Sequence, residues 1–148
     1  MKVRKLMSQA LATCRTHDTL ERAAQLMWER DIGAVPVVDD EGCVVGIVTD
    51  RDICMATYTR GAPPAAIGVG AAMATHVHTC APDDSLKDVE QQMARHQVRR
   101  MPVVDDDGRP VGMISINDIA RAAGRDVTPS EITATLAAVS APRSSPAA

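Results

Sequence analysis

Aromatic residues are almost absent from this chain, which has no phenylalanine, one tryptophan (Trp28) and one tyrosine (Tyr58). The core must therefore consist of valine, isoleucine, leucine, methionine and alanine. Proteins that hold single-stranded nucleic acid combine a basic groove with aromatic side chains on which the bases stack. This chain has no set of aromatics for that purpose, and its net charge of −3 offers no basic footprint. We therefore expect no direct binding of nucleic acid.

Long apolar runs and paired cysteines are also missing. No run approaches the roughly 18 apolar residues that a membrane-spanning helix needs. The basic N-terminus, residues 1–5, is not followed by the apolar segment of a secretory signal peptide. The four cysteines show neither C-x-x-C spacing nor a dense disulfide pattern. These absences predict a protein that does not span a membrane and lies in the cytoplasm, where thiols stay reduced.

The most informative positive feature is an internal duplication with a constant offset of 66 residues and no gap. The sequence PVVDD at residues 36–40 returns at 102–106, and Val45-Gly46 returns as Val111-Gly112. A unit of about 60 residues is marginally stable alone. We therefore expect repeat 1 (residues 1–62) and repeat 2 (residues 63–124) to share one core about a pseudo-twofold axis. Residues 125–148 should add a short helix and a disordered tail.

Each repeat predicts the order strand, helix, strand, strand, helix, which places the fold in the mixed α/β (α+β) class. In repeat 1 the first helix is expected from Asp18, with an apolar stripe that includes Trp28 as a core residue. Pro36 indicates that its strand is an edge strand or carries a bulge. Gly42 indicates a hairpin turn with positive φ. The remaining elements are expected at residues 11–14, 34–38 and 43–48, with last helices from Thr49 and Ser115 and a first helix of repeat 2 near Asp84-Ser85.

One further helix is predicted after the second repeat. Thr128, Pro129 and Glu131 are suited to its N-cap, first and third positions. Ile132, Leu136 and Val139 then form an apolar stripe that must pack on the chain's own core or on a partner. The segment from Ser140 to Ala148 has the composition of a disordered tail.

The starts of the two last helices carry the strongest functional signal. Thr49 is followed three residues later by Asp52, and Ser115 by Asp118. One interpretation is a capping box, in which these side chains satisfy the free amides of the helix start. The other is an anion site, because a helix N-terminus attracts phosphate and a nearby carboxylate accepts ribose hydroxyls. Both stay open at each position, and the repetition favours a nucleotide site.

The motifs h-P-V-V-D-x-x-G and G-h-h-[ST]-x-x-D, each present twice over residues 3–123, resemble a tandem cystathionine-β-synthase (CBS) domain pair, or Bateman module. The chain is similar to small stand-alone bacterial CBS-pair proteins, including the hypoxia-response type. The resemblance implies a non-catalytic regulatory sensor. It would bind an adenosine compound (AMP, ADP, ATP, S-adenosylmethionine or NAD) in two clefts between the repeats and need no cofactor. It also implies a homodimer and an unknown regulated protein.

The resemblance further implies roles for individual residues. Asp52 and Asp118 would hold ribose hydroxyls, Thr49 and Ser115 would lie near phosphate, and Asn117 belongs to the second of these helix starts. Arg51, Arg99 and Arg100 would neutralise phosphate charge. The adenine pockets would be lined by Ile32, Gly33, Ala34, Val35 and Pro36 in repeat 1 and by Val98, Arg99, Arg100, Met101 and Pro102 in repeat 2. Cys14 and Thr16, and Cys80 and Pro82, would close the pockets from the other side.

The repeats differ at positions that matter for charge. Gly33 and Ala34 correspond to Arg99 and Arg100, and Asp50 corresponds to Ile116. The Asp118 site is therefore expected to bind a polyphosphate, unless the two arginines form a solvated edge or a dimer contact.

Two other functions stay open. His76, His78 and Cys80 would share one face if they lay in a strand, and imidazole and thiolate are zinc ligands. No fourth ligand is evident, so we expect no metal site. Alternatively, the chain is a ligand-free scaffold that dimerises and docks on a partner.

Overall fold

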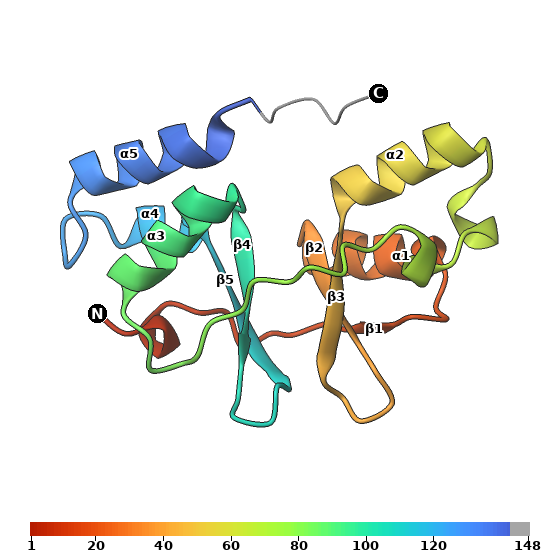
Figure 1. Cartoon of the computed structure of the whole chain (residues 1–148), viewed down its shortest axis with the longest axis horizontal. Coiled ribbons are helices and arrows are strands. Elements are labelled where there is room, and N and C mark those ends of the chain that lie inside the picture. The colour runs from red at the N-terminus through yellow and green to blue at the C-terminus, as the bar shows by residue number, and fades with distance from the viewer. Residues whose placement is uncertain (143–148) are drawn as a thin grey trace.

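The computed structural model describes residues 1–142, in which two repeats lie side by side (Figure 1). The mixed α and β content confirms the predicted fold class. Repeat 1 contains β1 (Cys14–Arg15), α1 (Leu20–Arg30), β2 (Ala34–Val38), β3 (Val44–Thr49) and α2 (Asp50–Arg60). Repeat 2 contains α3 (Leu86–His96), β4 (Arg100–Val104), β5 (Pro110–Ser115) and α4 (Ile116–Arg121), followed by α5 (Pro129–Ser140). Short 3-10 turns occur at η1 (Val3–Lys5), η2 (Pro64–Ala66) and η3 (Val69–Ala71).

The strands form two small sheets with matching registers. The first has the order β1-β2-β3 and the second the order β4-β5. Ala34 pairs with Thr49, and Arg100 pairs with Ser115 at the same offset of 66 residues. The bulge expected near Pro36 lies between Val37 and Val38, although β2 is the central strand and not an edge. In repeat 2 the first strand is reduced to a single bridge between Cys80 and Val103.

The first helix of repeat 1 begins later than the sequence predicts. Thr19 is its N-cap, and its hydroxyl accepts a hydrogen bond from the Arg22 amide at 3.2 Å. The Asp18 carboxylate accepts instead from the Arg15 amide, at 2.8 Å, in the preceding turn. The start of α3 at N-cap Ser85 and the positive φ of Gly42 (+85°) confirm the other local predictions.

The prediction of one shared core is wrong, because the buried apolar side chains form two clusters, one for each repeat. The clusters are linked by exchanged segments. Val3, at the N-terminus, is buried in the core of repeat 2, and its amide donates to the Asp84 carbonyl at 3.0 Å. Val69, in the connector, is buried in the core of repeat 1, and its amide donates to the Asp18 carbonyl at 2.7 Å. Each repeat thus completes the other's core, and the exchange follows the pseudo-twofold relationship.

The glycine of each G-h-h-[ST] motif has a packing reason. The exchanged segments cross β3 and β5 through bridges between Ala74 and Ile47 and between Ser8 and Met113. A Cβ on Gly46 would lie 2.6 Å from the sulfur of Met73, and one on Gly112 would lie 2.8 Å from the Ser8 carbonyl. Only glycine leaves room for the crossing segment.

The outer faces of the helices differ from the sequence-based expectation. Trp28 is 88% exposed, so its assignment to the core is wrong. Helix α5 starts at N-cap Thr128 as predicted and packs on α3 and α4. It does so through Ile132, Thr135 and Val139, while Leu136 stays 47% exposed. Of the predicted disordered tail, Ser140 ends α5, and residues 143–148 lie outside the described residues. Among residues 1–142, no helix has the length and apolar character needed to cross a membrane.

Candidate functional site

The helix starts of α2 and α4 have nearly the same hydrogen-bond geometry. The Thr49 amide donates to the Asp52 carboxylate at 2.9 Å, and the Asp52 amide donates to the Thr49 hydroxyl at 3.2 Å. The equivalent distances between Ser115 and Asp118 are 2.8 and 3.2 Å. Both are complete capping boxes. Capping is therefore confirmed at both sites, and it engages one oxygen of each carboxylate.

The two sites differ in the contacts of the second carboxylate oxygen of Asp52 and Asp118. The second oxygen of Asp118 forms an ion pair with Arg121, one turn further along α4. In α2 the position of Arg121 is occupied by Met55. Among the described residues no cation pairs with Asp52. An oxygen of Asp52 is therefore available to a ligand, whereas Asp118 already has a charged partner.

Asp52 also lines a hollow of about 260 Å³ between α2 and the connector. This volume is close to the lower limit of roughly 300 Å³ for small-molecule sites. The hollow offers a carboxylate, a hydroxyl and a guanidinium, from Asp52, Thr59 and Arg60. The rest of its lining is Met55, Ala56, Ala71 and Ala72.

The segments predicted to line the adenine pockets lie beside these helix starts. The Asp50 amide donates to the Gly33 carbonyl at 3.1 Å, and the Ile116 amide to the Arg99 carbonyl at 2.9 Å. Only the first residues of each segment are accessible, namely Ile32 and Gly33 in repeat 1 and Val98, Arg99 and Arg100 in repeat 2. The side chains of Ala34, Val35, Pro36, Met101 and Pro102 are buried.

The arginines predicted to serve the Asp118 site lie elsewhere. The Arg100 guanidinium lies against Gly33 of repeat 1, where a Cβ on Gly33 would be 2.8 Å from an Arg100 nitrogen and 3.0 Å from the Asp50 carboxylate. Arg99 donates to the Ser140 hydroxyl of α5 at 3.3 Å. Among the described residues, the ion pair of Asp118 is with Arg121 and not with Arg99 or Arg100. Arg100 instead lies beside the exposed Asp50 of repeat 1.

The residues expected to close the pockets have mainly structural contacts. Burial raises the pKa of the Cys14 thiol to about 11 and that of the equivalent Cys80 to about 12. The Thr16 carbonyl accepts from the Gly70 amide at 2.9 Å, and the Pro82 carbonyl accepts from the Arg4 amide at 3.0 Å. Thr16 and Pro82 therefore hold the exchanged segments, and both thiols stay protonated at neutral pH. Arg51 and Asn117 are exposed beside the helix starts.

The proposed zinc ligands are not arranged as the sequence predicts. The segment from His76 to Thr79 is not a strand, and Cys80 is buried. His78 stacks on His96 of α3 with ring centroids 3.7 Å apart, and His76 meets His78 edge-on at 5.3 Å. Partial burial, followed by the neighbouring His96 and His76, lowers the pKa of His78 below 6.5.

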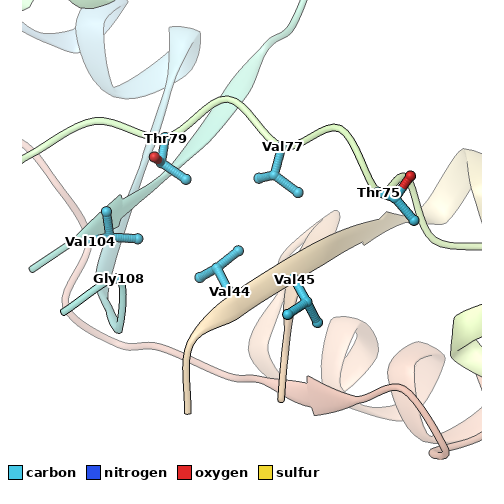
Figure 2. A pocket seen from close by; sticks show the side chains of 7 residues that line it. All are labelled: Val44, Val45, Thr75, Val77, Thr79, Val104 and Gly108. Atoms are coloured by element: carbon cyan, nitrogen blue, oxygen red, sulfur yellow. The ribbon is translucent and has the colours of Figure 1, made fainter. Parts of the chain in front are cut away.

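A second hollow, of about 240 Å³, lies between the repeats at the hairpin end (Figure 2). It is lined by Val44, Val45, Thr75, Val77, Thr79, Val104 and Gly108. The lining has no charged group, and none of the predicted site residues reaches it.

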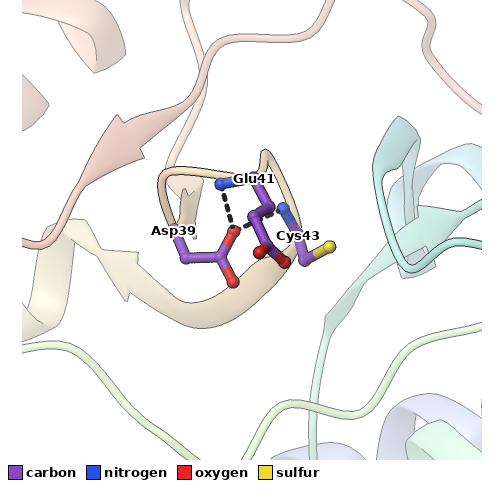
Figure 3. A group of neighbouring side chains, drawn as sticks. All are labelled: Asp39, Glu41 and Cys43. Atoms are coloured by element: carbon purple, nitrogen blue, oxygen red, sulfur yellow. Dashed lines mark hydrogen bonds between the residues drawn. The ribbon is translucent and has the colours of Figure 1, made fainter.

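Within residues 1–142, one group of side chains, Asp39, Glu41 and Cys43, has ligand atoms close enough together for a metal ion (Figure 3). The Asp39 carboxylate already accepts from the Glu41 and Cys43 amides at 3.0 and 2.9 Å. Asp105 makes the same bonds in the second hairpin, to the Asp107 and Arg109 amides. The duplicated geometry shows that these aspartates order hairpin turns.

Sequence reasoning missed one buried polar contact, between α3 and α5. Glu90 is 6% exposed, and it accepts a hydrogen bond from the Thr135 hydroxyl at 3.3 Å. Burial raises the pKa of the Glu90 carboxyl above its ordinary value. Glu90 corresponds to Ala24 in repeat 1. This difference between the repeats was the sequence feature that could have indicated the contact.

The comparisons with known proteins agree with the duplicated geometry. The CBS domain model matches residues 3–58 and again residues 69–125. The chain belongs to the CBS domain family. A CBS domain-containing protein of Bacillus subtilis, YhcV, is 37% identical over 118 residues, which are 80% of this chain and 82% of the relative.

Solved CBS structures share the fold. The CBS domain pair of protein MJ0100, in complex with 5′-methylthioadenosine and S-adenosyl-L-methionine, has a TM-score of 0.75 and 28% identity. The match covers 82% of this chain and 94% of that one. Hypoxic Response Protein I, with two coordinated zinc ions, has a TM-score of 0.74 and 33% identity over 83% of this chain and 99% of that one. The chain is thus a CBS pair, and pairs of similar fold include an adenosine-ligand binder.

Proposed function

We propose that this CBS pair is a regulatory module that binds an adenosine nucleotide, such as AMP, ADP or ATP, between its repeats. The observation that carries the proposal is the arrangement at the start of α2. There, an available oxygen of Asp52, the half-buried backbone of Gly33 and the guanidinium of Arg100 lie near one helix N-terminus. These groups suit a ribose, an adenine and a phosphate respectively. The adenosine ligands of the MJ0100 pair support the assignment.

The two clefts are not equivalent in this proposal. At α2, Arg100 and Arg51 offset the carboxylate of Asp50, so their guanidinium groups can bind a phosphate. At α4, Asp118 is paired with Arg121 and Arg99 is held by Ser140. Ligand binding at Ser115, Asn117 and Asp118 must break those contacts. The α2 cleft therefore binds first and more tightly.

The module regulates and does not catalyse in this proposal. It forms a homodimer in the cytoplasm, a location supported by its four free cysteines. Ligand occupancy then changes the dimer geometry or the contact with a regulated protein. Such a switch requires unequal affinity of the ligand for the two states.

The test is thermal unfolding of the full chain with AMP, ADP, ATP, S-adenosylmethionine and 5′-methylthioadenosine, after removal of co-purified nucleotide. A ligand at about 100 times its Kd stabilises by about 2.7 kcal/mol. For a chain of this size, that free energy raises the Tm by about 5–10 °C. Each variant is compared with its own ligand-free Tm, because Asp52→Ala and Asp118→Ala also weaken a helix cap.

Asp52→Ala should abolish the ligand-induced shift, and Asp118→Ala should leave most of it. Gly33→Leu should also abolish the shift, because its side chain enters the space beside Arg100 and Asp50. Gly68→Ala is the matched control, since its Cβ meets only the Asp18 carbonyl at 4.0 Å. No shift with any of these compounds at millimolar concentration contradicts the proposal and favours the ligand-free scaffold.

A further inference from the structure

Helix α5 is held on repeat 2 by little buried surface. It lies over α3 and α4 (Figure 1), but of its 12 residues only Thr135 and Val139 are buried, and one of these is polar. The chain enters α5 through a turn at Gly124, which has φ +85° and open space around it. Elements with few buried apolar contacts open at a low cost in free energy, and a free helix of this length is marginally stable in water. Docking of α5 therefore depends on a small number of contacts.

The buried polar contact beneath α5 has one hydrogen too few when Glu90 is ionised. The Thr135 hydroxyl lies 3.0 Å from the Glu131 carbonyl of its own helix and 3.3 Å from the Glu90 carboxyl of α3. A hydroxyl has a single hydrogen to donate. The carbonyl and the carboxylate therefore compete for it. Glu90 is 6% exposed, so water replaces little of the missing bond.

A proton on Glu90 completes this contact. The protonated carboxyl donates to the Thr135 hydroxyl oxygen, and the Thr135 hydrogen is then available to the Glu131 carbonyl. Each group has its partner in this arrangement, and no charge is buried. The contact between α3 and α5 is thus best satisfied when Glu90 is neutral.

The surrounding charges do not neutralise an ionised Glu90. Burial, followed by the charge of Glu131 on α5, raises the pKa of Glu90. Hydrogen bonds from Thr128, followed by the charge of Lys87 on α3, lower the pKa of Glu131, so Glu131 stays ionised where Glu90 titrates. The ion pairs near α5 are Asp118 with Arg121 on α4 and the Met1 ammonium with Asp126 before α5. In residues 1–142, no ion pair includes Glu90.

We propose that α5 is a strap held by this one proton: it is docked most firmly while Glu90 is protonated, and loss of the proton releases it from α3. The contacts of α5 with the side chains of Gln97 and Arg99 contain no group that titrates near neutral pH. Release uncovers the face of α3 around Glu90 and frees Arg99 from α5. The inference does not rest on nucleotide binding.

Hydrogen exchange of the ligand-free full chain between about pH 4 and pH 8 tests the proposal, with protection factors that correct for the intrinsic effect of pH on exchange. In the released state Glu90 has its ordinary pKa of 4.5. Protection of the α5 amides should therefore fall by up to about tenfold for each pH unit above 4.5 and level off at the folded pKa of Glu90. Helix α1 is the internal control and should not change. Protection in α5 that is independent of pH overturns the proposal.

Two pairs of variants locate the proton. Glu90→Gln donates to Thr135 as the protonated acid does, so α5 should stay protected at every pH, whereas Glu21→Gln on α1 should behave as wild type. Thr135→Val removes the acceptor and should lower the protection of α5 in acid. Thr133→Val is its matched control, because the Thr133 hydroxyl bonds the Pro129 carbonyl, at 2.8 Å, on the exposed side of α5.

A pH dependence that persists in Glu90→Gln assigns the release to another group and overturns the proposal. So does Thr135→Val with the same protection in acid as Thr133→Val. Carbon-13 NMR of the Glu90 carboxyl gives a measurement that needs no variant. Its midpoint should coincide with the pH at which the protection of α5 levels off, and a midpoint at the ordinary value of 4.5 contradicts the mechanism.

Discussion

Repeat 1 and repeat 2 have the same backbone arrangement but differ in the side chains and helices that cover their outer faces. Their hairpins have one register, their last helices have one type of cap, and their exchanged segments have one set of contacts. Repeat 1 presents Trp28 and Tyr58 to solvent, whereas repeat 2 is covered by α5. The comparison shows that duplication preserved buried and capping positions. The repeats diverged on their outer helical faces and where Gly33 and Ala34 of repeat 1 correspond to Arg99 and Arg100 of repeat 2.

The largest expected difference between the repeats concerns equivalent methionines of the first helices. Met93 has no exposed surface beneath α5, and Met27 is 8% exposed beside Trp28. Met93→Ala should destabilise by about 2–5 kcal/mol, because it removes buried methylenes and leaves a cavity. Met27→Ala should cost less, since solvent can reach its cavity. Urea unfolding measures both, and equal losses would show that α5 adds no burial.

The next largest effect is expected from weakening α5 alone. Thr128→Ala removes the capping box of this helix and should cost about 1 kcal/mol. Hydrogen exchange should increase in α5 and in the part of α3 beneath it, and stay unchanged in α1. Thr19→Ala, which removes the cap of α1, is the matched variant and should loosen repeat 1. Faster exchange in α1 after Thr128→Ala would contradict this local effect.

A smaller effect, dependent on pH, comes from the contact that repeat 1 lacks. Because burial raises the pKa of Glu90, the folded state binds its proton to higher pH than the unfolded state does. The contribution of Glu90 to stability is therefore greatest below its ordinary pKa of 4.5 and is lost as the pH rises. Glu90→Gln should be more stable than wild type at pH 7, and the two should converge in acid.

The control for this prediction is Glu21→Gln, at an exposed position of α1. Thermal unfolding at several pH values measures each difference. A Glu90→Gln variant that is less stable than wild type at pH 7 would show that the carboxylate is favourable in its site.

The smallest effect belongs to the histidine cluster. The lowered pKa of His78 means that the unfolded state takes up a proton first as the pH falls. Stability should therefore decline as the pH falls through 6.5 towards the lower folded pKa. His78→Asn should flatten this part of the pH profile, whereas His17→Asn, at an exposed position, should leave it intact. An unchanged slope in His78→Asn would assign the decline to other groups.

Much of the fold could be predicted because the signals are local and occur twice. Thr49 and Asp52 specify a helix start through local contacts alone. The same pair of residue types at Ser115 and Asp118 supports the offset of 66 residues between the repeats. Gly42 marks its turn for the same reason. The starts of α2 and α4 could also be recognised as candidate sites, since hydroxyl and carboxylate side chains at a helix start can contact a nucleotide.

The rest depended on contacts that spacing does not reveal. Arg100 is adjacent to Arg99 in sequence, yet it lies against Gly33 of the other repeat while Arg99 reaches α5. The apolar stripe of α1 predicted a buried Trp28, but the side chain is exposed, because periodicity alone does not show how far a buried helix face extends. The exchange of Val3 and Val69 between the cores joins residues from opposite repeats, which no pattern within one repeat indicates.

That exchange has a consequence for how the protein is made. On the ribosome, the N-terminal residues emerge first, but the backbone partner of Val3 is Asp84, some eighty residues later. At about 5–20 residues per second, the N-terminal segment waits on the order of ten seconds for its place in the second core. The first core waits in turn for the connector that supplies Val69. Neither half can mature alone during synthesis, and the chain completes its folding only when most of it has left the exit tunnel.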